Sequence, residues 1–491
     1  MQPMIAVTWI ELTGATLFGL AILHTFSTKY FEHLAHVRPG HAGLWHLLGE
    51  VETVFGFWSL ILLIFMAAAL GWGAATDYLD SSRFVEPMFV FVIMVISASR
   101  PVLQFVSDAV KRLAVVVPLP AAVAYYFLAL SVVPLFGSLV TEPAAMTLAA
   151  LMLRDVIFSR QASNRLKYLT LGVLFVNVSI GGTLSNFAAP PILMVAAKWG
   201  WDSATVFSMF GWKAIVAVLA NALILTLLFK KELTRKAKAS VAGTGARVPT
   251  AFVLVNLAIL AAIVATNHHR EVFVGLFLFF LGLAEAYKRH HDRLMLREGL
   301  MVAFFLAGLV VLGGQQQWWL QAVLSSLSET TLYYGATALT AITDNAALTY
   351  LGSLVSGVSD EFKYALVAGA VTGGGLTVIA NAPNPAGFAI LKNSFDEQSI
   401  NPFGLFLAAL PPTIVAVVCF RAMPQSALEM FDYRSWAQWF QSLDRAFLFL
   451  LILPFVVAVV GLWSDLSRAR RDKRESQAEL RHPSGLPDTV Q

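Results

Sequence analysis

Charged residues and cysteines are scarce in this sequence of 491 residues. Asp, Glu, Lys and Arg together make up 13% of it, whereas about a quarter of an average soluble protein is charged. Hydrophobic residues make up 57%, and the mean hydropathy is +0.70. So few charges cannot hydrate the surface of a large soluble chain, and this excludes a soluble globular enzyme.

The single cysteine, Cys419, lies in an apolar run. One cysteine excludes a disulfide framework, a cysteine zinc site and an iron–sulfur cluster. The sequence also has no Walker glycine loop, nucleophile elbow or dinucleotide fingerprint. We therefore expect neither an ATP-driven pump nor a cofactor, and the net charge of +4 gives no indication of a nucleic-acid partner.

Apolar segments close to the ~20 residues that cross a bilayer recur along the chain. Residues 4–26 lack the basic leader and cleavage site of a secretory signal, so they are interpreted as the first membrane helix. The pattern predicts an all-α polytopic membrane protein, with spans at about 4–26, 47–72, 84–106, 113–136, 205–229, 250–266, 272–287, 299–314, 403–423 and 446–464.

Two further apolar stretches, 137–198 and 328–392, are interrupted by polar, glycine and proline residues. Helix breaks at membrane depth persist only where protein or a water-filled cavity satisfies the freed backbone groups. Short loops rich in Lys and Arg face the cytoplasm, and four segments qualify: 154–167, 230–238, 288–297 and the tail from 468. They share one side if each interrupted stretch holds a re-entrant hairpin followed by a broken spanning helix, with Lys111 and Arg112 as exceptions.

The sequence contains an internal repeat. Thr141 to Thr147 resembles Thr343 to Thr349, and later pairs follow in the same order: Lys167-Tyr168 with Lys363-Tyr364, Gly181-Gly182 with Gly374-Gly375, and Ala189-Pro190 with Ala382-Pro383. We predict two repeats of inverted topology at 113–229 and 299–423. Secondary transporters use this architecture and bind substrates and ions at the repeat interface, near the bilayer midplane.

The predicted organisation surrounds these repeats with other segments. We expect scaffold helices at 1–112 and 250–298, a flexible cytoplasmic linker at 230–249, an interfacial helix and last span at 424–464, and a disordered cytoplasmic tail at 465–491. The N-terminus is expected to be cytoplasmic as well.

The tips of the two hairpins carry acidic residues. About a dozen helical residues on either side of Thr343-Asp344-Asn345 reach only ~18 Å, so this tip lies deep in the membrane. Glu142, with Thr141 beside it, occupies the equivalent tip. A buried ionisable group is by default a functional candidate, and the alternative is a carboxylate that only caps the following helix.

The two helix breaks supply facing surfaces. Their glycines allow close backbone approach and their prolines separate the half-helices, at Gly181, Gly182, Pro190, Pro191, Gly374, Gly375, Pro383 and Pro385. Freed carbonyl and amide oxygens suit a small cation, whereas a half-helix N-terminus suits an anion; the alternative is a kink that serves packing alone. The predicted cation or proton ligands are Asp344, Asn345, Thr343, Glu142, Thr141, Asn381, Asn384, Thr377, Asn186 and Ser185.

Histidines gather near the N-terminus. His46 and Glu50 stand four residues apart and could hold a transition metal, but we favour an interfacial or pH-sensitive loop and predict no metal site. Arg100 lies in apolar surroundings and is expected to pair with an acid that the sequence does not identify. His290 and His291 are expected in solvent.

The chain resembles the ion transporter superfamily of secondary carriers, and within it the bacterial sodium/proton antiporter branch. The resemblance rests on Thr343-Asp344-Asn345-Ala346-Ala347, on Gly373 to Gly387 with its Ile-Ala-Asn-Ala-Pro-Asn-Pro-Ala-Gly core, on Gly182 to Pro191 and on His46 to Glu52. It implies a scaffold with a moving, elevator-type transport domain, a homodimer and a place in the bacterial inner membrane. Carboxylate transporters of this superfamily carry Ser-Asn-Thr at both tips, whereas Thr-Glu-Pro and Thr-Asp-Asn here argue against a dicarboxylate substrate.

These patterns favour a sodium/proton antiporter without catalytic residues. Asp344, supported by Glu142, would bind either sodium or a proton, because apolar surroundings disfavour an unpaired carboxylate charge. The alternative is a sodium- or proton-coupled symporter of an organic or inorganic anion. A non-transporting receptor or scaffold gives no reason for paired broken helices.

Overall fold

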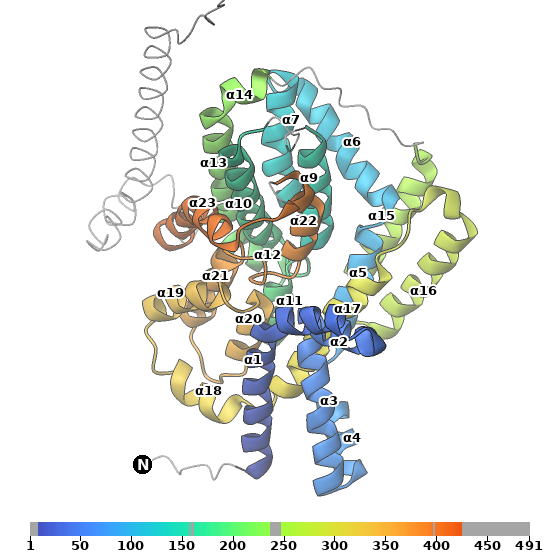
Figure 1. The fold of residues 1–491 in the computed structure, drawn as a ribbon, viewed down its shortest axis with the longest axis vertical. Helices are drawn as coiled ribbons and strands as arrows, with labels where there is room; N and C mark the ends of the chain where they lie inside the picture. The colour runs from blue at the N-terminus through green and yellow to red at the C-terminus, as the bar shows by residue number, and fades with distance from the viewer. Residues whose placement is uncertain (1–7, 157, 159–161, 236–246, 396–397, 425–491) are drawn as a thin grey trace, which may run out of the picture. The chain divides into compact units, whose positions relative to one another are not determined.

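The computed structural model describes residues 8–424, except 157, 159–161, 236–246 and 396–397. The chain divides into two units, Met1–Ala427 and Leu428–Gln491, and every described residue belongs to the first. Apart from residue 424, the predicted interfacial helix, the span at 446–464 and the tail lie outside the described residues. Within the described ranges every regular element is a helix (Figure 1), which confirms the all-α class.

Four helices follow the N-terminus: α1 (Trp9–Val37), α2 (Ala42–Gly49), α3 (Val51–Leu70) and α4 (Trp72–Ser81), with a 3₁₀ turn η1 (Pro39–His41) after α1. A capping box starts α1, because the Glu11 backbone N–H donates to Thr8 Oγ1 at 3.3 Å while the Thr8 N–H donates to the Glu11 carboxylate at 2.8 Å. These mutual bonds fix the first turn of the longest described helix.

The predicted span 84–106 is two helices, α5 (Val85–Ser97) and α6 (Arg100–Val116), which meet at an angle of 63°. The prediction of one continuous span was wrong because Pro101 has no backbone N–H with which to continue the α5 ladder. α6 is amphipathic: Val102, Val106 and Val110 are buried on one face, and Arg112 is exposed.

The predicted span 113–136 is also divided, into α7 (Ala121–Leu130) and α8 (Val132–Phe136). Pro134 cannot donate to the Leu130 carbonyl one turn before it. Asn177 takes over this role, since its Nδ2 donates to the Leu130 oxygen at 2.7 Å. A buried amide from another helix therefore compensates for the break.

One succession of elements then occurs twice: a helix, a polar turn, a second helix, a long helix, a break, a short helix and another long helix. The first series is α7 and α8, then α9 (Glu142–Val156), α10 (Asn164–Gly181), η2 (Gly182–Leu184), α11 (Pro190–Trp199), α12 (Ser203–Val206), the π-helical η3 (Phe207–Gly211) and α13 (Trp212–Leu228). The second is α19 (Glu329–Thr340), α20 (Asn345–Ser353), α21 (Asp360–Gly373), α22 (Asn384–Leu391), η5 (Lys392–Ser394) and α23 (Pro402–Ala422).

The remaining described helices are α14 (Lys230–Arg235), α15 (Thr250–Ala265), α16 (Arg270–Ala286), α17 (Leu296–Gly313) and α18 (Gln317–Leu324), with η4 (Lys288–His290) after α16. The linker predicted as a flexible loop thus begins as a helix. Among the described helices, six are long and apolar enough to cross a membrane, or seven if α5 and α6 count as one span. The divisions predicted after 112 and 298 fall inside α6 and α17.

Glycines allow two close helix contacts. Gly308 of α17 lies against the backbone of Phe55 and Gly56 in α3, while Gly56 faces the ring of Phe304. Gly172 of α10 lies against the Ala408 carbonyl of α23, and this carbonyl has no helical donor because Pro412 lacks an N–H. The backbones can approach only where a side chain is missing.

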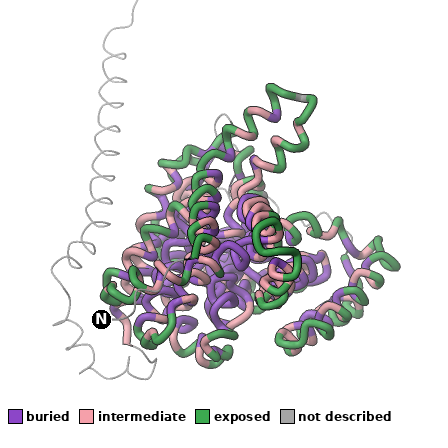
Figure 2. Tube along the Cα trace, turned by 90° about the horizontal axis from the view of Figure 1, so that it is seen from below, coloured by how far each residue is buried: buried purple, intermediate pink, exposed green. Residues whose placement is uncertain are grey.

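The two series also pack across each other. α9 lies against α22, and α11 lies against α20, so the helix after each polar turn contacts the short helix after the opposite break. The central part of this assembly is buried, and exposed positions lie toward its periphery (Figure 2).

Candidate functional site

Glu142 lies where the first polar turn meets both helix breaks. Its side chain is 0% exposed, and its Oε2 accepts a hydrogen bond from Asn381 Nδ2 at 2.8 Å. Its Oε1 has no hydrogen-bond partner among the described residues. Gly182 lies so close that a Cβ there would overlap this oxygen, so the first break encloses the carboxylate and the second supplies its donor.

Asp344 caps α20. Its Oδ1 accepts from the backbone N–H groups of Ala346 at 2.8 Å and Ala347 at 3.1 Å. The capping alternative left open by the sequence is therefore the observed geometry of this half-buried residue.

Asn345 follows Asp344 and is fully buried. Its backbone N–H donates to the Ala380 carbonyl at 3.1 Å, which ties the second polar turn to the second break. Neither Oδ1 nor Nδ2 of its side chain has a hydrogen-bond partner within the described ranges. A Cβ at Gly374 would lie 2.8 Å from Asn345 Nδ2, so this glycine provides the space for the amide.

Asn384 holds the second break in shape. Its Nδ2 donates to the carbonyls of Gly374 and Thr377, both at 2.8 Å. Thr377 Oγ1 donates to the Ala341 carbonyl at 2.8 Å, which joins the break to the end of α19. The amide nitrogen of Asn384 is thus occupied, and its Oδ1 is left without a donor in the described part of the chain.

Four buried oxygens of this region have no hydrogen-bond partner among the described residues: Glu142 Oε1, Asn345 Oδ1, Asn381 Oδ1 and Asn384 Oδ1. Buried polar atoms are nearly always partnered by protein, water or an ion. Carboxylate and amide oxygens are also the ligands that hard cations prefer. These four oxygens are therefore of the chemical type that binds a small cation.

The other predicted ligands have side chains that already form hydrogen bonds elsewhere. Thr141 Oγ1 lies 2.8 Å from Ser97 Oγ of α5, and Ser185 Oγ donates to the Ser138 carbonyl at 2.6 Å. Thr343 Oγ1 donates to the Leu339 carbonyl at 2.9 Å within its own turn. The side chain of Asn186 binds the segment before α12 instead. Its Nδ2 donates to the Trp201 carbonyl at 3.0 Å, and its Oδ1 accepts from Ser203 Oγ at 2.9 Å.

The predicted hinge residues lie at the helix breaks. Pro190 and Pro191 open α11, Pro383 caps α22, and Pro385 is its second residue. Gly181 lies against the Pro134 carbonyl, and Gly375 lies against the backbone of Val176 in α10. Both glycines sit where a side chain would separate the packed elements.

Residues 9–423 match a family of proteins described as "Putative Na+/H+ antiporter". The chain belongs to this family. The match confirms the resemblance found in the sequence, and no curated protein matches the chain. An antiporter family together with six membrane-capable helices makes this a multi-pass membrane protein that acts on cations across a lipid bilayer, in a family of transporters rather than enzymes.

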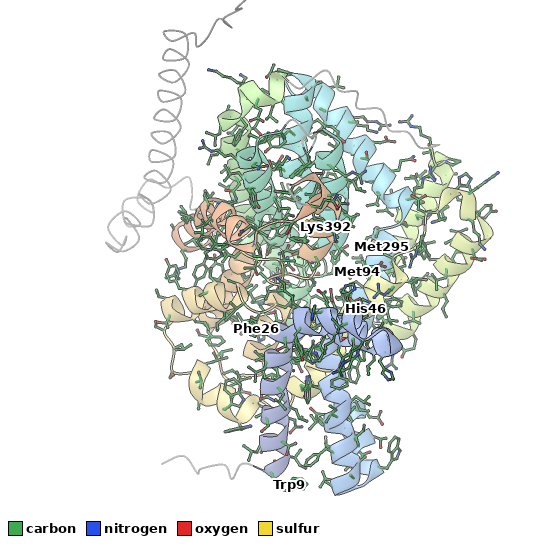
Figure 3. All side chains as sticks on the ribbon, in the orientation of Figure 1. Trp9, Phe26, His46, Met94, Met295 and Lys392 are labelled. Atoms are coloured by element: carbon green, nitrogen blue, oxygen red, sulfur yellow. The ribbon has the colours of Figure 1, made fainter. Side chains whose placement is uncertain are left out.

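The weak metal candidates of the antiporter lie at the end of α2, where Figure 3 labels His46. Glu50 caps this helix and forms an ion pair with Arg297 at 2.5 Å, while the ring of His46 packs edge-on to His36 with centroids 6.0 Å apart. Among the described residues, no group of three or more His, Cys, Asp or Glu could hold a metal ion.

Two other predictions from the sequence had different outcomes. Arg100 pairs with an acid as expected, and the acid is Asp292 at 3.2 Å. His291 was expected in solvent but is 8% exposed, because its ring packs against Phe280 of α16. Neither ring nitrogen has a hydrogen-bond partner within the residues described.

Sequence reasoning missed Lys213, a buried residue of α13. Its Nζ donates to Tyr364 Oη at 2.8 Å, and Tyr364 in turn donates to the Phe420 carbonyl at 2.5 Å. These bonds join α13 to α21 and α23. A lysine inside an apolar span was a sufficient signal.

Proposed function

We propose that the chain exchanges sodium for protons at Glu142, with Asn345, Asn381 and Asn384 as neutral oxygen ligands. The supporting observation is the set of four buried oxygens that lack donors among the described residues. They come from the two polar turns and the second break, beside Gly182 of the first. The family match supports antiport over anion symport, the alternative from the sequence.

Glu142 is favoured over Asp344 as the exchanging carboxylate, although the sequence favoured Asp344. Two backbone N–H groups already bind Asp344 Oδ1, which stabilises its charged form without any ion. Glu142 has one amide donor and one open oxygen. In this proposal Asp344 attracts the cation through its charge, and Glu142 contacts it.

Burial explains why exchange would be coupled. An unpaired carboxylate is costly in low-dielectric surroundings, so Glu142 needs either a cation or a proton whenever the site is closed to water. A proton removes the charge that holds the cation. The two ions therefore compete for one group, and each crossing carries one of them.

The repeated succession of helices supports two inverted repeats at 113–229 and 299–423. The reciprocal contacts α9–α22 and α11–α20 are those expected of two related units facing each other. In this interpretation α7 to α9 and α19 to α20 are re-entrant hairpins, flanked by scaffold helices. Elevator-type movement, a homodimer and a bacterial inner membrane complete the proposal and rest on the resemblance alone.

The test is sodium-dependent proton movement in proteoliposomes with an imposed proton gradient. Glu142→Gln should abolish exchange, because an amide can neither ionise nor be protonated. Asn381→Ala should raise the apparent KM for sodium by at least about tenfold, since losing a hydrogen bond to a charged group costs about 1.5–3 kcal/mol. Asp344→Asn should keep partial exchange, because asparagine also caps helices well.

The matched control is Glu329→Gln, which removes an exposed carboxylate at the start of α19. It should exchange ions as the wild type does. Exchange at the wild-type rate by Glu142→Gln would overturn the assignment, and loss in Asp344→Asn alone would return the role to Asp344.

A further inference from the structure

One face of α5 runs from the surface toward the site. Glu86, Val90, Ile93 and Ser97 follow one another at three- or four-residue spacing, so they line one side of the helix. Ser97 ends this row with its 2.8 Å hydrogen bond to Thr141, the chain neighbour of Glu142. Glu86 begins it, in the first turn of α5.

Glu86 lies at the meeting point of two pockets. The first is formed by α5, the first helix break, α11 and the loop between α15 and α16, with polar lining from Glu86, Asn186 and Asn267 and with His268 at its edge. The second contains the basic side chains Arg83 and Lys198. Glu86 lines both pockets, whereas Arg83 lines only the second.

A small apolar cavity lies between the first pocket and the site. Leu193 of α11 lines both spaces. Val90 and Ile93 line the inner cavity from α5, and Val302 lines it from α17. The cavity reaches Thr141 and Ala382, the immediate neighbours of Glu142 and Asn381.

Oxygen chemistry distinguishes the two pockets. The first offers the Glu86 carboxylate beside the amide of Asn267, oxygen groups that attract and partly dehydrate a small cation. The second adds two basic side chains, Arg83 and Lys198, to the same carboxylate, and these repel a cation. A cation approaching from this end of α5 would therefore meet Glu86 first and then the apolar constriction at Leu193.

We propose that Glu86 is a second cation-binding carboxylate, at the mouth of a path that follows α5 to Glu142, with Leu193, Val90 and Ile93 as its apolar gate. The ligand class is a small monovalent cation. The inference rests on the proposed exchange at Glu142.

The first test is sodium kinetics of the full-length chain in proteoliposomes. Glu86→Gln should raise the apparent KM for sodium about three- to tenfold at low ionic strength and leave kcat unchanged, because only the approach of the cation is affected. The increase should shrink when an inert salt screens the charge.

Glu271→Gln is the matched control. Glu271 is an exposed acid next to the loop between α15 and α16, pairs with Arg270 at 3.2 Å and lines neither pocket. An unchanged KM in Glu86→Gln, or an equal rise in Glu271→Gln, would overturn the mouth site.

A second test follows the path without measuring transport. In a Cys419→Ala background, Ile93→Cys and Leu193→Cys should react with a small charged methanethiosulfonate at least tenfold faster than Val95→Cys. Val95 is a fully buried residue of the same helix that packs toward Gly299 instead. Equal rates at the three positions would overturn the path.

Sodium-dependent proton exchange by the wild type is compared with the labelling result to separate the two proposals. If the wild type exchanges no ions but the labelling difference persists, the proposed exchange fails and the path stands. If the wild type exchanges ions without a labelling difference, the path fails alone.

Discussion

His291 shows how one buried side chain can make stability depend on pH. It lies in the loop between α16 and α17, where burial lowers the pKa of its ring and neighbouring His290 lowers it further, while Asp292 opposes them. The folded chain thus binds a proton less readily than the unfolded chain. The stability contributed by the neutral His291 ring should therefore be complete above about pH 6.5. Below that pH the free energy of unfolding should decrease as the pH falls.

His291→Leu should weaken this acid destabilisation. We expect the thermal midpoint in detergent to fall less between about pH 7.5 and pH 5.5 in the variant than in the wild type, because the variant has no ring to protonate. His269→Gln, at an exposed loop position, should keep the wild-type pH dependence. An identical decline in His291→Leu and wild type would contradict the prediction.

The composition of the candidate site could be predicted from residue types, but the roles of its carboxylates could not. A sequence shows that Asp344 is able to cap a helix, yet only backbone geometry shows that Ala346 and Ala347 donate to it. Ser138 beside the site gave no signal, because a serine in an apolar run usually bonds its own turn. Ser138 instead donates to the Gly181 carbonyl at 2.6 Å.

At the scale of elements, hydropathy located helices better than their ends. The predicted spans at 250–266, 272–287, 299–314 and 403–423 each correspond to one helix. The predicted spans at 84–106 and 113–136 each correspond to two helices. Hydropathy measures the transfer of side chains into lipid and is averaged over many residues, so it does not detect a proline that interrupts the backbone hydrogen bonds. Pro101 and Pro134 were visible in the sequence, but the donor that replaces the missing bond is visible only in space.

The contact between α10 and the second break should depend on Gly375. A Cβ there would overlap the backbone of Val176, which cannot move aside as a flexible side chain can. Gly375→Ala should therefore lower the thermal midpoint by several degrees, as overpacking typically costs about 1–3 kcal/mol. The measurement is thermal unfolding of purified protein in detergent.

Gly335 of α19 offers the opposite case. No atom lies within 4 Å of its Cβ position, so Gly335→Ala should stabilise the helix by roughly 0.5–1 kcal/mol. A Gly375→Ala variant as stable as Gly335→Ala would show that the break relaxes without cost.

At the scale of the described unit, the bend before α6 changes the surroundings of Lys111 and Arg112, the predicted exceptions to the charge rule. Arg100 at the start of α6 pairs with Asp292, and Asp108 in its middle pairs with Arg247 at 3.4 Å. The part of α6 before Lys111 and Arg112 thus lies beside Arg247 and Asp292, which the predicted continuous span did not allow. Ser163 Oγ donates to Glu232 at 3.0 Å, which joins the loop before α10 to α14.

The same geometry bears on the N-terminus. Gly14 of α1 lies against Gln315, which comes just after the last residue of α17. Arg297 lies at the opposite end of α17, in its first turn. If the basic loops are cytoplasmic, Trp9 at the start of α1 lies on the opposite side. This differs from the cytoplasmic N-terminus expected from the sequence.

Labelling of single cysteines in intact cells would test this orientation. In a Cys419→Ala background, an impermeant maleimide should label His269→Cys, Ser326→Cys and Trp9→Cys. It should label Lys231→Cys and Lys288→Cys only after the membrane is opened. Labelling of Lys288→Cys in intact cells would reverse the proposed orientation, and protection of Trp9→Cys would restore the sequence-based one.

The glycine contact between α3 and α17 has an asymmetric genetic consequence. A side chain at Gly56 would meet the ring of Phe304, whereas one at Gly308 would meet the backbone of Phe55 and Gly56. A second mutation that shortens residue 304 could therefore suppress a defect at Gly56. No single side-chain replacement can move the backbone that Gly308 meets, so suppressors of a defect at Gly308 should be rarer and lie farther from it.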